Sequence, residues 1–329
     1  MSNQPPIEVP QGAIRLNTDS QKLEFFAQDR WYEFATDSPT LDGGGRALSM
    51  GGQAPSDIDI VEFVTIPTQG NATDFGNLSV TRTQSAGFGS RVRGFCVGGM
   101  VSPGTYKNEI DFHEFSTTGN FTDFGNLTGN ARLLAAFSNS TRGVAAGGQP
   151  RNDVIDFITM SQTGNAVDFG DLPASDLFGS GLASPTRGLI KDGSDNDNTI
   201  SFITIATLGD AQDFGDLSVS RGTHVQTAAN STRGIFAGGQ TPSADNTIDF
   251  VTIATLGNAS DFGDLTRSTV ETNAGASDPT RAIFMGNGPG AGDTIDYVAF
   301  ATEGNAVDFG NLSASRTHNC GCSNAHGGL

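Results

Sequence analysis

Short apolar runs separated by glycine, asparagine and serine are the main pattern of this chain. In the stretch that begins at Arg233, an apolar run at 234–239 ends in two glycines, and a run rich in β-branched residues follows at 247–253. Residues 256–259 contain the glycine and asparagine of a tight turn, and 260–265 and 270–276 are two further short runs. Such runs, bounded by turn residues, predict four antiparallel strands. No segment of helix length shows helical periodicity.

The same pattern repeats along the chain. The triplet Asp-Phe-Gly occurs six times, at spacings of 49, 45, 45, 48 and 47 residues, beginning at Asp74, Asp123, Asp168, Asp213, Asp261 and Asp308. An arginine that opens an apolar run also occurs six times, at Arg46, Arg93, Arg142, Arg187, Arg233 and Arg281. A four-stranded unit repeated every ~40–50 residues is typical of a β-propeller. The sequence therefore predicts an all-β fold with six blades.

The two ends of the repeat predict how the propeller closes. Residues 317–323 match the first strand of the interior units, whereas the first unit begins at Arg46 with its second strand. The two ends together make one complete blade. We therefore predict a six-bladed β-propeller over 46–329 that is closed by strand exchange between its N- and C-terminal parts, which removes open sheet edges.

The second-strand segments resemble a known repeat. Residues 142–148 read Arg-Gly-Val-Ala-Ala-Gly-Gly, and an aromatic residue follows in the next predicted strand of five units, at Phe112, Phe157, Phe202, Phe250 and Tyr297. This arrangement resembles the kelch repeat, and the resemblance extends from 46 to 329. The kelch tryptophan is absent, and the phenylalanine of Asp-Phe-Gly stands in its place. The resemblance implies a kelch-like β-propeller but no particular activity.

Residues before 46 do not follow the repeat. Residues 12–26 read as strand, Asn-Thr-Asp turn and strand, and 28–34 add a third strand. We expect a small β-meander at 1–36, too small to fold well alone, and a linker at 37–45. The form Gly-x-Ile-Arg-x-Asn-Thr-Asp-x-x-x-Leu-Glu, which ends near Trp31, resembles a segment of bacteriophage virion proteins. The repeats, with Gly-Asn-Ala-x-Asp-Phe-Gly-Asp-Leu, resemble those in structural proteins of marine cyanophages and related tailed phages.

Composition excludes several classes of partner. With 18 Lys+Arg against 36 Asp+Glu, the net charge is −18, so we expect no binding to nucleic acid or to an anionic membrane surface. No stretch reaches the ~18 apolar residues of a membrane helix, so no membrane insertion is expected, and the first residues lack the pattern of a signal peptide. Cys96, Cys320 and Cys322 form neither a disulfide framework nor a recognisable zinc site, and we expect small buried thiols.

Catalytic motifs are not found in the sequence. Of the four histidines, His113, His224, His318 and His326, none recurs between units. There is no Gly-x-Ser-x-Gly elbow, His-Glu-x-x-His or Walker loop, and Asp-Phe-Gly lacks the glycine-rich and catalytic loops of a kinase. The sequence therefore predicts a protein that is not an enzyme, with no cofactor and no metal site.

Polar residues that recur in the units are expected to serve the fold. The recurring arginine and the acidic residue of the third strand predict either an arginine–carboxylate pair or a carboxylate that satisfies a turn. For Asp-Phe-Gly we expect the Asp to cap a turn and the Phe to be a wedge between blades. The representative residues are Arg142, Asp156, Asp168, Phe169, Arg233, Asp249, Asp261 and Phe262.

Recognition is expected at one face of the propeller. Because the strands are antiparallel, the loop after each second strand and the loop after each fourth strand share a face, and these loops vary between units. The turns of the opposite face are nearly identical. Variable loops on a rigid scaffold are where recognition usually occurs. The candidate recognition residues are Tyr106, Lys107, Arg151, Asp195, Asp197, Asp245 and Asp293.

Together these features predict a virion structural protein of a tailed phage, located in the extracellular particle as a tail, baseplate or fibre component. Its propeller would dock other proteins or adhere to a receptor on the host surface. The segment 1–36 would join other virion proteins, in a homo-oligomer or symmetric multicopy assembly whose multivalency compensates weak single contacts. The alternative is a secreted or surface bacterial kelch-like protein with carbohydrate-binding or oxidase activity.

Overall fold

The structure, a computed structural model, describes residues 9–17, 22–33, 45–174, 179–193, 197–221, 225–241, 243–269, 274–286 and 292–329. The chain divides into two compact units, Met1–Thr40 and Leu41–Leu329. Within the described ranges all regular structure is β-strand, and the sheets are antiparallel. The all-β class is confirmed.

The N-terminal unit contains one three-stranded sheet, in the order β1 (Ile14–Asn17), β2 (Lys22–Ala27), β3 (Arg30–Glu33). On one of its faces the Arg15 guanidinium donates to Glu24 at 2.8 Å and lies 4.0 Å from the ring centre of Trp31. Neighbouring strand positions point to opposite faces, so Ile14 and Leu16 lie on the other side. They are 63% and 61% exposed, which gives this small sheet an apolar outer face.

The second unit contains six four-stranded sheets, each with its strands in sequence order except that the first borrows its innermost strand from the end of the chain. Sheet 1 consists of β29 (Cys320–Ser323), β4 (Arg46–Met50), β5 (Ile60–Thr65) and β6 (Thr73–Asn77). Sheet 2 consists of β7 (Ala86–Gly89), β8 (Arg93–Val97), β11 (Glu109–Glu114) and β12 (Thr122–Asn126). Sheet 3 consists of β13 (Ala135–Ser138), β14 (Arg142–Ala146), β15 (Val154–Thr159) and β16 (Val167–Asp171).

The remaining three sheets have the same plan. Sheet 4 consists of β17 (Ser180–Ala183), β18 (Arg187–Lys191), β19 (Thr199–Thr204) and β20 (Gln212–Asp216). Sheet 5 consists of β21 (Gln226–Ala229), β22 (Arg233–Thr241), β23 (Ser243–Thr252) and β24 (Ser260–Thr269). Sheet 6 consists of β25 (Ala274–Ser277), β26 (Arg281–Met285), β27 (Thr294–Ala299) and β28 (Val307–Asn311). Of the run predicted at 270–276, residues 274–276 lie in β25 and 270–273 lie outside the described residues.

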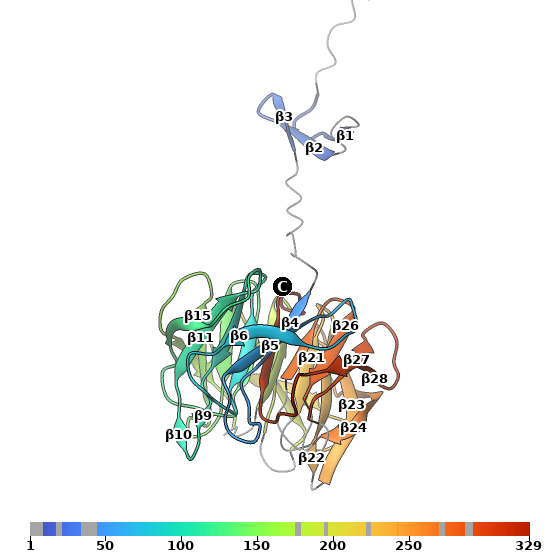
Figure 1. Cartoon of the computed structure of the whole chain (residues 1–329). Helices are drawn as coiled ribbons and strands as arrows, with labels where there is room; N and C mark the ends of the chain where they lie inside the picture. The colour runs from blue at the N-terminus through green and yellow to red at the C-terminus, as the bar shows by residue number, and fades with distance from the viewer. Residues whose placement is uncertain are drawn as a thin grey trace, which may run out of the picture. The chain divides into compact units, whose positions relative to one another are not determined.

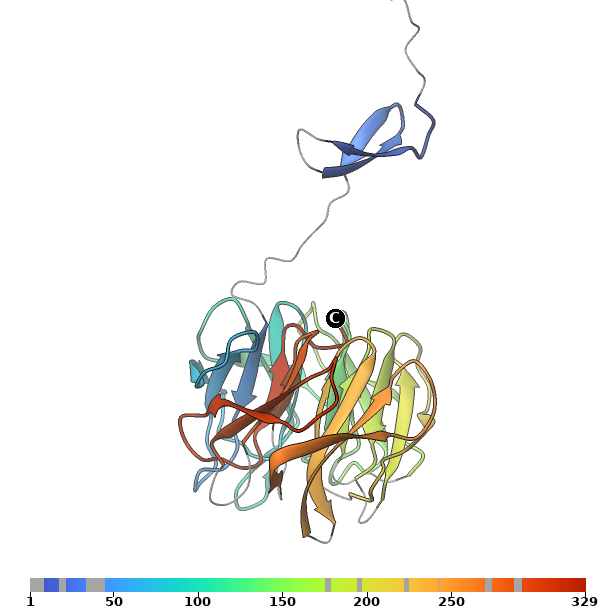
Figure 2. The ribbon, with the colours of Figure 1, turned by 90° about the vertical axis from the view of Figure 1, so that its right-hand side faces the viewer.

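Strand β29, at the end of the chain, pairs with β4, at the start of the second unit. Cys322 faces Leu48 in this ladder, although the two residues are far apart in the sequence. In Figures 1 and 2 the red strands from the end of the chain lie beside the lighter blue strands β4, β5 and β6. The turn before the second strand has the same hydrogen bond in sheet 1, where it is formed by the end of the chain, as in sheet 3. In sheet 3 the Asn139 side chain accepts a hydrogen bond from Arg142 N at 2.8 Å, and in sheet 1 Asn324 accepts one from Arg46 N at 2.8 Å.

Apolar clusters join each sheet to the next. The burial follows from β-branched and aromatic side chains on both faces of every sheet, as expected for sheets stacked face to face. Each of six clusters combines two consecutive sheets, and sheet 6 is joined to sheet 1 in the same way. Representative pairs are Phe75 with Phe121, Phe124 with Ile158, Phe169 with Ile203, Phe214 with Ile253, Phe262 with Val298 and Phe309 with Val64. The first strands also contact one another in the order β7, β13, β17, β21, β25, β29 and again β7.

The outer strand of each sheet is covered by a loop of the next sheet. Between sheets 4 and 5, Gly257 N donates to Phe214 O at 2.9 Å and Ala259 N donates to Asp216 O at 2.7 Å. The Asn258 side chain accepts from Asp216 N at 3.1 Å. The same hydrogen bonds recur between sheets 6 and 1, where Gly70 N donates to Phe309 O at 3.1 Å. This contact explains the recurring Gly-Asn turn and leaves the outer strand without a free edge.

The recurring arginine also joins consecutive sheets. Arg142 lies 4.7 Å from the ring centre of Phe157 in its own sheet, and its guanidinium donates to Ile205 O of the next sheet at 2.7 Å. Arg233 makes the corresponding contacts, at 4.8 Å to Phe250 and 2.8 Å to Phe300 O. The expected pair between this arginine and the third-strand carboxylate is therefore not the arrangement found. The guanidinium instead reaches across the junction, where an aromatic face and a carbonyl oxygen are its partners.

The third-strand carboxylate has the other expected role, that of satisfying a turn. The fully buried carboxylate of Asp249 accepts from Ser218 N at 3.1 Å and Ser218 Oγ at 2.5 Å, and pairs with the buried Arg221. Asp156 accepts from Thr128 in the same way, and its ion pair is with Arg151 at 3.0 Å. Both carboxylates thus hold the loop that comes from the preceding sheet.

The Asp-Phe-Gly triplets lie within the fourth strands rather than in turns. Asp168 and Asp261 are exposed, and they face Asp156 and Asp249 across the ladder at a β-bulge. The turn-capping role expected for this Asp is therefore wrong for these strands. The rings of Phe169 and Phe262 are buried and meet Phe157 and Phe250 edge-on, with ring centres 5.9 and 5.8 Å apart.

Candidate functional site

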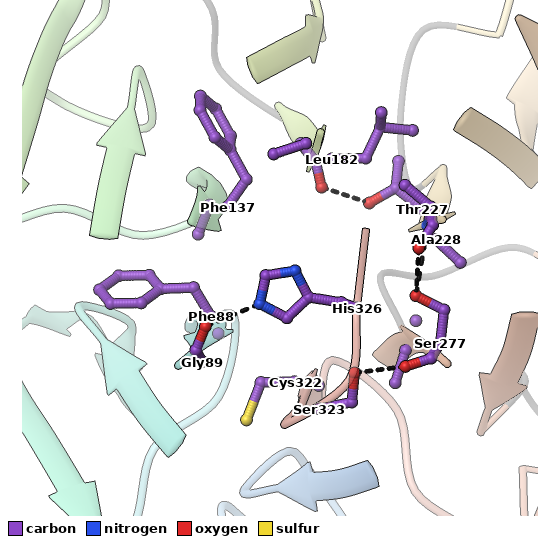
Figure 3. Close-up of a pocket in the computed structure, with 18 of the residues that line it drawn as sticks. Phe88, Gly89, Phe137, Leu182, Thr227, Ala228, Ser277, Cys322, Ser323 and His326 are labelled. Carbon is purple, nitrogen blue, oxygen red and sulfur yellow. Dashed lines mark hydrogen bonds between the residues drawn. The ribbon is translucent and has the colours of Figure 1, made fainter. Parts of the chain in front are cut away.

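The space between the first strands is too small for an organic ligand. Gly87, Gly181, Gly275 and Gly321 line it, together with larger side chains, among them Phe88, Phe137 and Leu182 (Figure 3). Two cavities are found there, with volumes of about 50 and 90 Å³. A single water needs ~10–15 Å³ measured in this way, so these cavities hold a few waters but no sugar ring or cofactor.

His326 and the two glycines after it cover one mouth of this space. His326 Nε2 lies 2.7 Å from Gly89 O, and Nδ1 accepts a hydrogen bond from Gly328 N at 3.1 Å (Figure 3). Gly327 N donates to Ala229 O at 2.8 Å, on the far side of the mouth. The geometry requires a proton on Nε2 and none on Nδ1, and burial lowers the pKa of His326 to about 4. His326 is therefore a neutral structural residue near pH 7.

The described residues hold no cluster of three or more His, Cys, Asp or Glu side chains arranged to bind a metal ion. In the same parts of the chain, no helix has the length and apolar character needed to cross a membrane.

The loops after the second strands form the opposite face of the unit. In sheet 2 this loop folds into the hairpin β9 (Met100–Val101) and β10 (Thr105–Tyr106), and in sheet 5 it is extended by the long strands β22 and β23. Figure 1 shows β9, β10 and the end of β22 at one end of the unit and the C-terminus at the other. We call this the hairpin face. On this face, Arg132 lies among Gln84, Gln149 and Tyr106, which we call the Arg132 group.

The Arg132 guanidinium is held by neutral groups. Its Nη1 donates to Gln84 Oε1 at 2.7 Å, and its Nε donates to Gln149 Oε1 at 3.0 Å. It also lies 5.1 Å from the ring centre of Tyr106. None of these partners is a carboxylate, so none of them offsets the positive charge of this side chain. A guanidinium has five donors in a planar fork, which suits it to carboxylate, sulfate or phosphate groups.

The position of Arg132 departs from the repeat. In three other junctions the arginine of this loop is fully buried against the third-strand carboxylate of the next sheet, as Arg82 with Asp111, Arg221 with Asp249 and Arg316 with Glu62. Here Ala131 occupies that place, and its N–H makes the corresponding backbone hydrogen bond to Lys107 O at 2.9 Å. Arg151 has taken over the ion pair to Asp156. The arginine of this loop stands one position later in the sequence than in those junctions, so Arg132 lies next to the hairpin instead.

The structure places the predicted recognition residues as follows. Tyr106 lies in the Arg132 group, and Lys107 pairs with Glu109 at 3.1 Å. The Arg151 side chain is only 6% exposed and neutralised by Asp156, so it belongs to the fold and not to a recognition surface. Asp197 and Asp245 accept hydrogen bonds from Thr199 N at 2.9 Å and Thr247 N at 2.8 Å, which is a turn-capping role.

Two of the predicted residues contribute less to the site. Asp293 is half-buried, and its carbonyl oxygen accepts from Leu312 N at 2.6 Å, whereas Asp195 lies outside the described residues. Of the seven candidates, Tyr106 and Lys107 remain. Arg132, Gln84 and Gln149 were not predicted. The signal was present in the sequence, because alanine stands at 131, where the corresponding positions 82, 221 and 316 are arginine, and the arginine follows at 132.

Sheet 4 carries a second departure from the repeat. Ser201 replaces the third-strand carboxylate, and Pro173 replaces the Ser or Thr that would donate to it. The second strand of the same sheet, β18, is followed by Asp192 and ends in Lys191, where other units have an apolar residue and then glycine. Lys191 is 1% exposed and donates to Asp192 O. Ser201 Oγ donates to Asp192 Oδ2 at 3.3 Å, and burial raises the pKa of Asp192 to about 6. Because the donor at position 173 and the carboxylate at position 201 are both absent, neither group is left without its partner, and the change is one within the fold.

Comparisons of the sequence with known protein families and with curated proteins found no match.

Proposed function

We propose that residues 46–329 form a closed six-bladed β-propeller of kelch-like type, with the six sheets as its blades. The proposal is supported by three series of contacts that run from each sheet to the next and also from sheet 6 to sheet 1. They are the apolar clusters, the Gly-Asn turn on the outer strand, and the arginine that reaches the next carbonyl, of which Arg281 to Ile66 O at 3.1 Å is the sixth member. Pairing of β29 with β4 completes the first blade.

This propeller is a structural protein of a tailed-phage virion, a tail, baseplate or fibre component, and its hairpin face docks a protein or adheres to the host surface. The observation that carries the proposal is the contrast between junctions and hairpin face. The residues that join the sheets recur from unit to unit, whereas within the described residues an arginine packed on the tyrosine of a hairpin, as Arg132 on Tyr106 of β10, is found in one loop. A residue needed by every blade serves the fold, and a charged group present in one blade is available for recognition.

The N-terminal unit is the attachment segment in this proposal. A three-stranded sheet with an apolar outer face at Ile14 and Leu16 is too small to be stable by itself, so it is suited to pack on copies of itself or on other virion proteins. The chain enters the propeller at Gly45 and Arg46, and residue 46 and the C-terminus lie away from the β9–β10 hairpin (Figure 1). The hairpin face is therefore free when the propeller is tethered through residue 45.

Binding of labelled protein to cells of candidate host strains, measured by flow cytometry, tests the recognition part. Arg132→Gln, and a second variant in which residues 101–105 are replaced by a two-residue turn, are expected to reduce cell binding at least tenfold, since losing one charged contact at an interface weakens binding by roughly 2 kcal/mol or more.

Arg91→Gln is the matched control. Arg91 is an exposed arginine in the turn between β7 and β8, which belongs to the opposite face. It removes the same charge and should leave binding unchanged. Equal binding by the wild type, Arg132→Gln and the hairpin variant would refute recognition by this face.

A further inference from the structure

Two cysteines from distant parts of the chain lie side by side between sheets 1 and 2. Cys96 is on β8 and Cys320 is on β29, and their sulfur atoms are 3.6 Å apart across 224 residues of sequence. Both side chains are buried, and all three cysteines are free thiols in this structure. A disulfide bond is ~2.05 Å long, so the two sulfur atoms must approach each other by roughly 1.5 Å for a bond to form.

The surroundings of this pair favour a thiolate at Cys96. The guanidinium of Arg82 is fully buried beside it, and Ser85 Oγ lies 3.4 Å from Cys320 Sγ. The hydrogen bond from Cys320 and the positive charge of Arg82 lower the pKa of Cys96, while the same contact and burial raise the pKa of Cys320. A cysteine with a lowered pKa beside an arginine is the more nucleophilic member of a pair.

Cys322 provides an internal comparison. It lies two residues from Cys320 on the same strand and in the same apolar cluster. Burial raises its pKa, although a backbone hydrogen bond with Phe95 opposes that effect. The structure therefore separates one thiol pair from a third, unreactive thiol.

We propose that Cys96 and Cys320 form a disulfide when the protein meets a small-molecule disulfide such as oxidised glutathione, and that this bond fastens strand β29 to the second sheet. The Cys96 thiolate attacks one sulfur of the oxidant, and one reduced glutathione leaves. Cys320, after losing its proton, attacks Cys96 Sγ in the mixed disulfide, and a second reduced glutathione leaves. Two protein thiols are oxidised and one disulfide of the oxidant is reduced, so atoms and electrons balance.

The bond would act where the fold depends on a long-range contact. Strand β29 is held to β4 by a ladder between residues 270 to 276 positions apart, and it completes sheet 1. Separation of β29 would expose both thiols to the oxidant, and reclosure would bring them together. Once formed, the bond keeps β29 beside β8 even when the ladder to β4 opens.

The test uses the full chain incubated with oxidised glutathione at a temperature just below its melting transition. Intact mass and peptide mapping without reduction are expected to show loss of two hydrogens, one remaining free thiol and a Cys96–Cys320 crosslink. The melting temperature should rise by roughly 5 °C and return after reduction, because a bond that closes a long loop restricts the unfolded chain.

Three variants complete the experiment. Cys322→Ser should keep the crosslink and the rise in melting temperature, whereas Cys96→Ser and Cys320→Ser should abolish both. In Cys320→Ser, Cys96 should stop at the glutathione adduct. A crosslink through Cys322, no crosslink in wild-type protein, or a Cys96–Cys320 bond that leaves the melting temperature unchanged would each overturn the proposal. The wild-type mass measurement does not depend on whether the variants fold.

Discussion

The glycine of the Asp-Phe-Gly triplet should be among the most sensitive positions in the fold. Gly215 has φ of +145°, and a Cβ placed on it would lie 2.6 Å from the carbonyl oxygen of Gly257 in the next sheet. Gly257 has almost the same backbone conformation, φ +150°, but a Cβ there meets nothing within 4 Å. Gly215→Ala and Gly257→Ala therefore share the cost of backbone strain and differ in the contact between sheets.

The magnitudes follow from this geometry. Placing alanine in this region of φ costs about 1–3 kcal/mol in either variant. Gly215→Ala must also push the Gly257 turn away, which strains or breaks the three hydrogen bonds that join Gly257, Asn258 and Ala259 to β20. At about 1 kcal/mol each, their loss adds roughly 2–3 kcal/mol. We expect Gly215→Ala to lower the free energy of unfolding by about 3–6 kcal/mol and Gly257→Ala by about 1–3 kcal/mol.

Urea unfolding followed by far-UV circular dichroism is the appropriate assay. The single tryptophan, Trp31, belongs to the N-terminal unit and does not report on the six sheets. If the two variants differ by less than about 0.5 kcal/mol, the Gly257 turn does not pack on Gly215 and the reasoning about the junctions is wrong.

Three further predictions address closure, pH dependence and the two units. Arg281→Met should destabilise the protein by about 1–3 kcal/mol, as much as Arg142→Met, because Arg281 joins sheet 6 to Ile66 of sheet 1; a neutral Arg281→Met in thermal melts beside a destabilising Arg142→Met would indicate an open arrangement. His326 has a pKa of about 4 when folded and ~6.5 when unfolded, so its contribution, roughly 2 kcal/mol for a partly exposed ring, is complete above pH 6.5 and lost toward pH 4. Asp192, with a pKa of about 6 when folded, has the opposite trend and destabilises as pH rises from 4 to 6. Asp192→Asn should therefore steepen the acid-side loss of stability relative to wild type and His326→Asn should flatten it, and parallel pH profiles for all three proteins would contradict this. Removal of residues 1–40 should leave the melting temperature of the second unit within about 2 °C of the full chain, and a larger fall in calorimetry would show that the units stabilise each other.

Much of the strand pattern could be predicted because the same short apolar runs and turn residues recur in each unit. The run at 247–253 lies in β23 except for its last residue, the run at 260–265 lies within β24, and the strand expected at 317–323 contains β29. β-Branched runs, turn glycines and a constant period encode these elements locally. The lengths of β22, β23 and β24 in sheet 5 were not predicted, because their ends pair through polar residues that look like loop in the sequence.

The partners of the charged residues could not be predicted from spacing. Asp249 binds a serine and an arginine from the preceding unit, 31 and 28 residues earlier, whereas the nearer candidate, Arg233, reaches forward to Phe300. The sequence contains both arginines and no local rule that distinguishes them. Arg132 was missed for the same reason. It is not paired with Asp156 because Arg151 makes that ion pair and Ala131 occupies the arginine's usual place in the loop.

Mass spectrometry of virus particles, purified by density gradient from cultures that produce this chain, tests the central proposal most directly. The account predicts peptides from both units at an abundance comparable with that of other structural proteins of the particle. It also predicts that they remain after protease treatment and washing at high salt have removed adsorbed protein. Their absence from purified particles, with the chain present in the cells or the culture fluid, would contradict a virion role.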